Sequence, residues 1–288
     1  MPVRIVTDST AMLPPELAAE RDIAVVPLQV VIGPHVHDEG ADGATPEAVA
    51  AALRSFTPVS TSRPAPAVFA DLYRRLAEEG AEEILSIHLS ADMSGTYESA
   101  QVAARDAGVR VLTVDTRLVG PGVGYAVLAA ADVLAAGGGL EDAARAAQES
   151  AAASTSLFYV DTLEHLRRGG RIGAAAALVG SALAVKPLLG FDDGRVVPLE
   201  RVRTSGRALA RLEELAVEAA DGAEAGVRVE VSVAHLASPD RAAQLAERLA
   251  ERLAERLDGA EVTCGELGAV LGAHVGPGVV AVCVAPRA

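Results

Sequence analysis

The sequence contains few aromatic residues and no tryptophan. Aromatic residues make up 3% of the 288 positions, whereas apolar residues of all kinds make up 50%. The core must therefore be built mainly from alanine, valine and leucine. The chain also has only two cysteines, Cys264 and Cys283. Two are too few for a disulfide framework, and they are typical of buried thiols in a cytosolic protein.

Positive charge and long hydrophobic runs are scarce as well. The net charge is −14, which argues against a nucleic-acid partner and against docking on an anionic membrane, since both attract basic surfaces. No segment offers the ~20 unbroken apolar residues that a membrane-spanning helix needs. The first residues, Met1–Val6, lead directly into a predicted strand, without a signal peptide. We expect a soluble, cytoplasmic protein with no integral membrane contact.

Strands alternate with helices up to about residue 150, which predicts a parallel α/β sheet. Beyond this point the pattern changes. Val196–Arg203 and Val227–His235 alternate apolar and polar residues, as strands of an antiparallel sheet do. The alanine-rich segment after Gly173 is apolar on nearly all sides and predicts a fully buried helix. We therefore predict two α/β domains, residues 1–153 with a parallel sheet and 154–288 with a mostly antiparallel one.

One stretch of the first domain combines a buried strand, a short polar loop and the start of a helix. The strand is the apolar run Ile84–Leu89, and Ser94, Gly95 and Thr96 follow it. Such a connection presents free backbone N–H groups and a positive dipole end to an anion. A carboxylate or phosphate held by these hydroxyls is one interpretation, and Ser94 as a helix cap is the other. The hydroxyls of Thr61–Ser62, which precede another predicted helix, leave the same two alternatives open.

Two further motifs suggest a cofactor, and each has a simpler interpretation. His35 and His37 share one face of an extended segment, but no third metal ligand is evident, so a solvated turn is the alternative. Gly120–Gly124 is a glycine-rich turn after a strand, as in dinucleotide-binding proteins. However, Pro121 disrupts that fingerprint, which favours a tight entry to a helix. We predict neither a metal nor a cofactor.

Basic residues are concentrated between residues 151 and 210. This segment has eight basic and five acidic residues, a balance of +3 in a chain whose net charge is −14. Such a patch is either an ordinary solvated face or the contact surface for something negative, whether a ligand head group, a phosphate or an acidic partner.

Four separated motifs resemble the DegV family in their order and spacing. They are Thr61–Pro64, Leu89–Tyr97, Leu166–Ile172 and His274–Gly278. The resemblance runs from Asp8-Ser9 to the terminal strand Val279–Val284, and Val114–Thr116 and Lys186–Leu189 also match. It implies two α/β domains with a lipid between them.

The resemblance also implies a function. The protein is expected to bind a long-chain fatty acid and to present the carboxylate to a separate ATP-dependent fatty acid kinase subunit, which makes an acyl phosphate. It would then be a lipid-binding subunit and not an enzyme by itself. The residues implied at the carboxylate are hydroxyl groups, the glycine between two of them and one histidine: Thr61, Ser62, Ser94, Gly95, Thr96 and His274.

Three basic residues receive roles from the same resemblance. Arg171 and His274 are similar to a basic pair that supports phosphoryl transfer. Arg203 is similar to a position used in docking the kinase.

Two enzymatic alternatives remain at this stage. A serine hydrolase would use Ser94 as nucleophile and His274 as base, although Ser94 does not lie in a Gly-x-Ser-x-Gly elbow. A sugar-phosphate or nucleotide enzyme would use the parallel sheet, with Asp8 at the carboxyl end of a strand.

Overall fold

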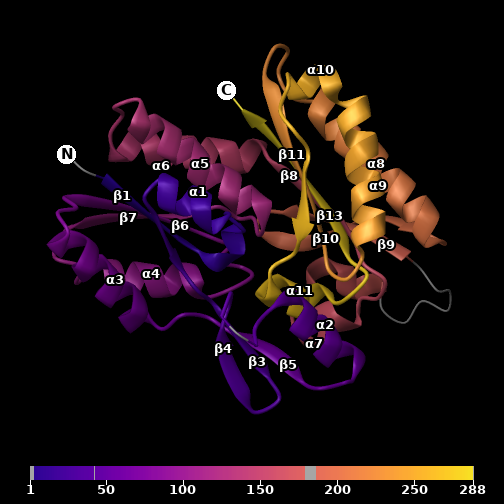
Figure 1. The fold of residues 1–288 in the computed structure, drawn as a ribbon, viewed down its shortest axis with the longest axis horizontal. Helices are drawn as coiled ribbons and strands as arrows, with labels where there is room; N and C mark the ends of the chain where they lie inside the picture. Colours follow the sequence, from indigo (N-terminus) through magenta and orange to yellow (C-terminus); the bar gives the residue numbers. More distant parts are fainter. Residues whose placement is uncertain (1–2, 42, 179–185, 288) are drawn as a thin grey trace. The chain divides into compact units, whose positions relative to one another are not determined.

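A computed structural model of the chain describes residues 3–41, 43–178 and 186–287. They form two compact units (Figure 1). The first contains the residues up to 29 and residues 61–152, and the second contains residues 30–60 and the residues from 153 onward. The last segment of the second unit begins at Ala153, and the sequence predicts a single boundary between residues 153 and 154. A single boundary there assigns segment 30–60 to the first domain, whereas in the structure this segment belongs to the second unit.

A four-stranded parallel sheet forms the centre of the first unit. Its strands lie in the order β2-β1-β6-β7, and each pairs with its neighbour in parallel. This arrangement confirms the predicted parallel α/β sheet, in which helical crossovers connect the strands. The bounds are Val3–Asp8 for β1, Ile23–Val26 for β2, Glu83–His88 for β6 and Arg110–Asp115 for β7.

Helices cover both faces of this sheet (Figure 1). On one face, α3 (Pro66–Glu78) and α4 (Thr96–Ala104) pack on the strands, and Phe69 and Tyr73 of α3 join Ile84 in one buried cluster. On the other face, α5 (Pro121–Ala135) contacts β1 and β6. The unit also contains α1 (Pro15–Glu20), α6 (Leu140–Ala153) and the 3-10 turn η1 (Ser9–Ala11).

The second unit is built on a six-stranded sheet in the order β10-β9-β8-β13-β11-β12. All neighbours are antiparallel except β11 and β12, which confirms the predicted, mostly antiparallel sheet. Leucines of α9 enter a core that α8 and the sheet share. The bounds are Thr155–Tyr159 (β8), Lys186–Asp192 (β9), Arg195–Val202 (β10), Arg228–His235 (β11), Thr263–Glu266 (β12), Val280–Arg287 (β13), Ser205–Asp221 (α8), Pro239–Arg252 (α9) and Ala254–Leu257 (α10).

A smaller layer of the second unit carries two of the motifs. It contains the sheet β4-β3-β5 and three helices, of which α11 contacts both α2 and α7. The apolar run Ile23–Ile32 divides into β2 and β3, which belong to different sheets, because Pro27 between them has no N–H for a strand ladder. The bounds are Gln29–Ile32 (β3), His35–Asp38 (β4), Val59–Ser62 (β5), Pro46–Arg54 (α2), Glu164–Arg168 (α7) and Ala269–Val275 (α11).

The alanine-rich segment after Gly173 differs from the prediction of a fully buried helix. Gly173–Leu178 is a 3-10 turn, η2, that contacts β10. Ala175 and Leu178 are buried, while Ala174, Ala176 and Ala177 are exposed. The segment packs on one side only, so its low polarity does not reflect burial all round. The remainder of the predicted helix lies outside the described residues. Among the helices of the described ranges, none has the length and hydropathy needed to cross a membrane.

Candidate functional site

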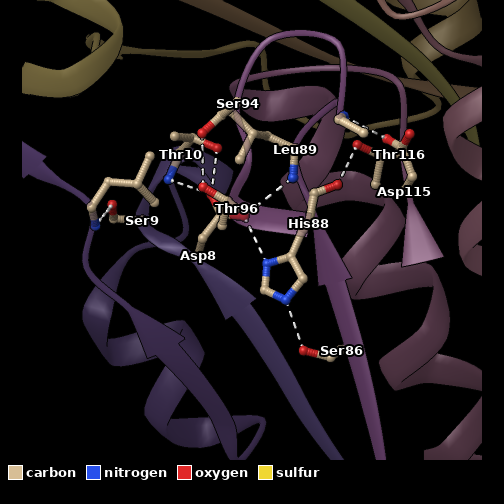
Figure 2. A network of polar contacts seen from close by, with 12 residues as sticks. Asp8, Ser9, Thr10, Ser86, His88, Leu89, Ser94, Thr96, Asp115 and Thr116 are labelled. Atoms are coloured by element: carbon tan, nitrogen blue, oxygen red, sulfur yellow. Dashed lines mark hydrogen bonds and ion pairs between the residues drawn. The ribbon is translucent and has the colours of Figure 1, made fainter. Parts of the chain in front are cut away.

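The carboxyl ends of β1, β6 and β7 bring three loops of the first unit together (Figure 2). They are Asp8–Thr10, Leu89–Gly95 and Asp115–Leu118. Parallel strands end at the same edge of a sheet, which is where ligands bind in open α/β folds. Thr116 ties the third loop to the end of β6, because its hydroxyl donates to the carbonyl oxygen of His88 at 2.9 Å.

The loop that carries Ser94 is held by its own backbone. All N–H groups from Leu89 to Ser94 are hydrogen-bonded within the first unit, and three of them bond back to Ser90. The acceptors are Asp8 Oδ2 for Leu89, Leu118 O for Ser90, Asp115 Oδ1 for Ala91, Ser90 Oγ for Asp92, and Ser90 O for Met93 and Ser94. The sequence interpretation that this loop offers free N–H groups is therefore wrong for these residues.

The start of α4 has the properties of an anion site. Its N-cap is Gly95, and no side chain of the described residues caps the helix. The Ser94 hydroxyl lies 2.9 Å from that of Thr96, so the interpretation of Ser94 as a helix cap is wrong. The first N–H groups of a helix have no intrahelical acceptor and carry its positive dipole end. Two hydroxyls beside them can donate to a small anion.

The Thr61–Ser62 segment ends β5 and does not cap α3. The N-cap of α3 is Ala65, which makes no side-chain capping bond. Arg63 connects this segment to the Ser94 loop, because its Nη1 donates to the carbonyl oxygen of Gly95 at 3.1 Å. A Cβ atom at Gly95 would overlap the Arg63 guanidinium. The missing side chain therefore makes room for Arg63.

Arg63 is a candidate site residue that the sequence analysis missed. Its motif was recognised, but its guanidinium received no role. The pairing with Gly95 spans 32 positions, so no local spacing reveals it. The available signal is an arginine directly after two hydroxyl residues.

Asp8 is fully buried and its carboxylate is saturated. Oδ1 accepts from the N–H (3.1 Å) and the hydroxyl (2.5 Å) of Thr10. Oδ2 accepts from His88 Nδ1 at 2.9 Å and from the N–H of Leu89 at 3.1 Å. These four bonds use the acceptor sites of a carboxylate. Asp8 supports the loops and is not available to a sugar phosphate or nucleotide.

Two motifs of the second unit interlock through glycines. Gly169 lies against the ring of His274, and Gly276 lies against the ring of His165, so a Cβ atom at either glycine would overlap a histidine. Arg171 Nη1 donates to the carbonyl oxygen of Gly169 at 2.6 Å. Arg171 and His274 thus lie on either side of Gly169, one bonded to its carbonyl oxygen and the other with its ring against its Cα.

Arg171 and His274 do not both carry a positive charge at neutral pH. Burial first, and then the positive charge of Arg171, lower the pKa of His274 to about 4. Its imidazole is therefore uncharged at neutral pH and can donate one hydrogen bond and accept another. Arg171 supplies the permanent positive charge.

Arg203 lies apart from this pair in the chain. It stands between β10 and α8, whose N-cap Thr204 accepts from the N–H of Arg207 at 3.3 Å. Its side chain is exposed. The structure therefore places this positive charge on the surface of the second unit, where a partner can reach it.

Comparison with known proteins identifies the family. A family model described as "Uncharacterised protein, DegV family" matches residues 2–287. The chain belongs to the DegV family. A DegV domain-containing protein of Streptomyces coelicolor is 51% identical to it over 285 residues, and the match covers 99% of each chain.

Solved DegV structures share the fold. A fatty-acid-binding DegV family protein from Thermus thermophilus superposes with a TM-score of 0.91 and 34% identity. DegV from Bacillus subtilis, a fatty acid binding protein, gives a TM-score of 0.89 and 32% identity. Both matches cover 100% of this chain and of the relative. The predicted family and the two-domain α/β fold are confirmed.

The other motifs of this DegV family member support loops. The Ser9 hydroxyl accepts from the N–H of Leu28 at 3.0 Å, and Lys186 Nζ pairs with Asp161 at 2.9 Å. The Gly120–Gly124 turn opens α5, and a Cβ atom at Gly124 would overlap the carbonyl oxygen of Ala11. Gly124 therefore serves packing.

The two histidines of β4 lie near each other. The ring centroids of His35 and His37 are 6.2 Å apart. In the ranges that the structure describes, no three His, Cys, Asp or Glu side chains are grouped to hold a metal ion.

Proposed function

We propose that this protein binds a long-chain fatty acid and presents its carboxylate to a separate ATP-dependent fatty acid kinase subunit, which forms the acyl phosphate. The observation that carries the proposal is the hydroxyl pair Ser94–Thr96 at the uncapped start of α4. Two solved relatives from the same family are fatty-acid-binding proteins. In this proposal the chain is a cytoplasmic lipid-binding subunit of phospholipid metabolism, with no catalytic residue, metal or cofactor of its own.

The site for the carboxylate head group is proposed to consist of hydrogen-bond donors. Ser94, Thr96 and the N–H groups at the start of α4 would bind the carboxylate oxygens, together with the hydroxyls of Thr61 and Ser62. A carboxylate removed from water needs such partners, and hydrogen bonds to a charged group are the strong ones. Arg63, held against Gly95, adds a positive charge beside them.

The tail is proposed to supply most of the affinity. About 16 carbons buried at ~0.8 kcal/mol per CH₂ contribute on the order of 12 kcal/mol before entropic costs. The polar head then fixes which end of the ligand reaches the kinase.

The basic residues of the second unit are proposed to act with the kinase. Arg171 would offset charge on the incoming phosphate, and the uncharged imidazole of His274 would hydrogen-bond the carboxylate. Arg203, exposed between Arg201 and Arg207, would dock an acidic surface of the kinase.

The contacts of Ser94 favour binding over hydrolysis. Its hydroxyl partner is Thr96, which is not a base. The buried histidine of the same unit, His88, uses both ring nitrogens on Asp8 and Ser86. A nucleophilic serine needs a positioned base, whereas a carboxylate ligand needs only donors.

Lipid content tests the proposal directly. Protein purified from a cellular host is expected to release a long-chain fatty acid on denaturing extraction, identified by mass spectrometry. Extraction of an unrelated protein from the same host is the control. Well-folded protein that yields no fatty acid and takes up none when it is added would contradict the proposal.

Ser94→Ala tests the head-group site. We expect this change to weaken fatty-acid binding by about 1.5–3 kcal/mol, the range for a hydrogen bond to a charged group. Stability without lipid should change by ~1 kcal/mol or less, the typical net contribution of one intramolecular hydrogen bond, here the one to the Thr96 hydroxyl. Ser99→Ala is the matched control, because this buried hydroxyl of α4 has no hydrogen-bond partner among the described residues. Equal affinities for the two variants would exclude Ser94 as a ligand.

A further inference from the structure

Four fully buried side chains of the first unit form one hydrogen-bonded chain. The Tyr73 hydroxyl on α3 lies 2.7 Å from Ser86 Oγ, and Ser86 Oγ lies 2.7 Å from His88 Nε2. His88 Nδ1 lies 2.9 Å from Asp8 Oδ2. Figure 2 shows the imidazole of His88 between Ser86 and Asp8.

The protons of this chain have one arrangement that satisfies every group. Burial raises the pKa of Tyr73 to about 12, so its hydroxyl stays protonated and donates to Ser86. Ser86 then donates to His88 Nε2, and His88 donates from Nδ1 to the Asp8 carboxylate. The opposite direction would leave the tyrosine proton without an acceptor in an apolar core, which is costly. The chain therefore has a fixed direction that ends at Asp8.

Asp8 links this hydrogen-bonded chain to the loop that carries Ser94. The carboxylate oxygen that accepts from His88 also accepts from the N–H of Leu89, the first residue of that loop. The N–H groups of Ser90 and Ala91 bond to Leu118 and Asp115, and those of the next three residues bond back to Ser90. Asp8 therefore holds one of the three points at which the backbone of this loop is anchored. Displacement by about 1 Å at a binding group is enough to weaken its interactions strongly.

We propose that Asp8, His88, Ser86 and Tyr73 are positioning residues, which hold the Ser94 loop in the geometry that binds a carboxylate. The inference rests on the proposed function. None of the four touches the ligand in this account. A catalytic role as an Asp-His-Ser set does not fit, because Ser86 is fully buried within β6 and is hydrogen-bonded to Tyr73.

The test measures recognition of the head group separately from stability. Affinities for palmitic acid and hexadecanol, which share one tail, are compared by displacement of a fluorescent fatty acid at a pH where the acid is ionised. The wild-type protein is expected to prefer the acid by about tenfold or more. Asp8→Asn should reduce this preference to about threefold or less, with hexadecanol affinity within about twofold of wild type.

Milder variants keep the test valid if Asp8→Asn does not fold. Ser86→Ala and Tyr73→Phe remove single hydroxyls, and the loss of preference should be larger for Ser86, which is closer to Asp8. Leu85→Ala is the control, because this buried residue lies on the other face of β6. Removing its side chain destabilises the sheet without removing any of the four hydrogen-bonded side chains. Its acid preference should equal that of wild type.

The outcomes separate the two proposals. Folded variants of the buried chain that keep the wild-type preference would overturn the positioning role. An equal loss in Leu85→Ala would overturn it too, since destabilisation alone would then explain the effect. A wild-type protein that binds both compounds equally would instead overturn the carboxylate site itself.

Discussion

Gly276→Ala is expected to lower the free energy of unfolding of the second unit by about 3 kcal/mol. Gly276 ends α11 with φ 76° and ψ 169°, a region that only glycine occupies readily and that costs ~1–3 kcal/mol for other residues. The new methyl group would also overlap the ring of His165, and overpacking of a well-packed site costs ~1–3 kcal/mol. The effect is measured by chemical denaturation, with hydrogen exchange of amides in the second unit as the probe of unfolding.

Two further variants separate backbone strain from the steric overlap. Gly226 has φ 83°, and none of the described atoms lies within 4 Å of the point where its methyl group would stand, so Gly226→Ala carries strain alone and should cost ~1 kcal/mol. Adding His165→Ala to Gly276→Ala should recover part of the loss, because neighbouring changes are not additive. A cost for Gly276→Ala no greater than that for Gly226→Ala would show that the two motifs do not interlock.

Local patterns predict the elements well. The apolar run before Ser94 and the small residues after it give β6 and α4 as expected. Thr45, directly before Pro46, caps α2 and accepts from the N–H of Ala48 at 3.2 Å. Such features depend on residues three or four positions apart, which a sequence displays directly.

The missed features depend on residues far apart in the chain. His165, which directly precedes the Leu166–Ile172 motif, lies against Gly276 of another motif, and Arg63 reaches Gly95 across 32 positions. Segment 30–60 joins the second unit although the chain around it belongs to the first. Asp8 shows a different limit. A carboxylate at the end of a strand suggests a ligand site, and only its four hydrogen bonds reveal a structural role.

Arg171→Ala and His274→Ala are each expected to slow acyl-phosphate formation by at least about tenfold, measured with a cognate kinase and ATP. Arg171 is proposed to stabilise charge on the transferring phosphate, an effect that acts mainly in the transition state. His274 is uncharged at neutral pH, so its alanine variant loses a hydrogen bond and not a charge. Lipid retention should fall much less in both variants, because the tail supplies most of the affinity.

The matched control is Arg168→Ala, since Arg168 is exposed in the same motif and pairs with Glu164 at 2.7 Å. It removes one positive charge near the pair without removing a proposed contact to phosphate, and its turnover should stay within about twofold of wild type, as for most exposed surface pairs. Lipid content is measured beside turnover for each variant. Turnover that stays unchanged in both Arg171→Ala and His274→Ala, or that falls only in proportion to lipid content, would rule out a role of this pair in phosphoryl transfer.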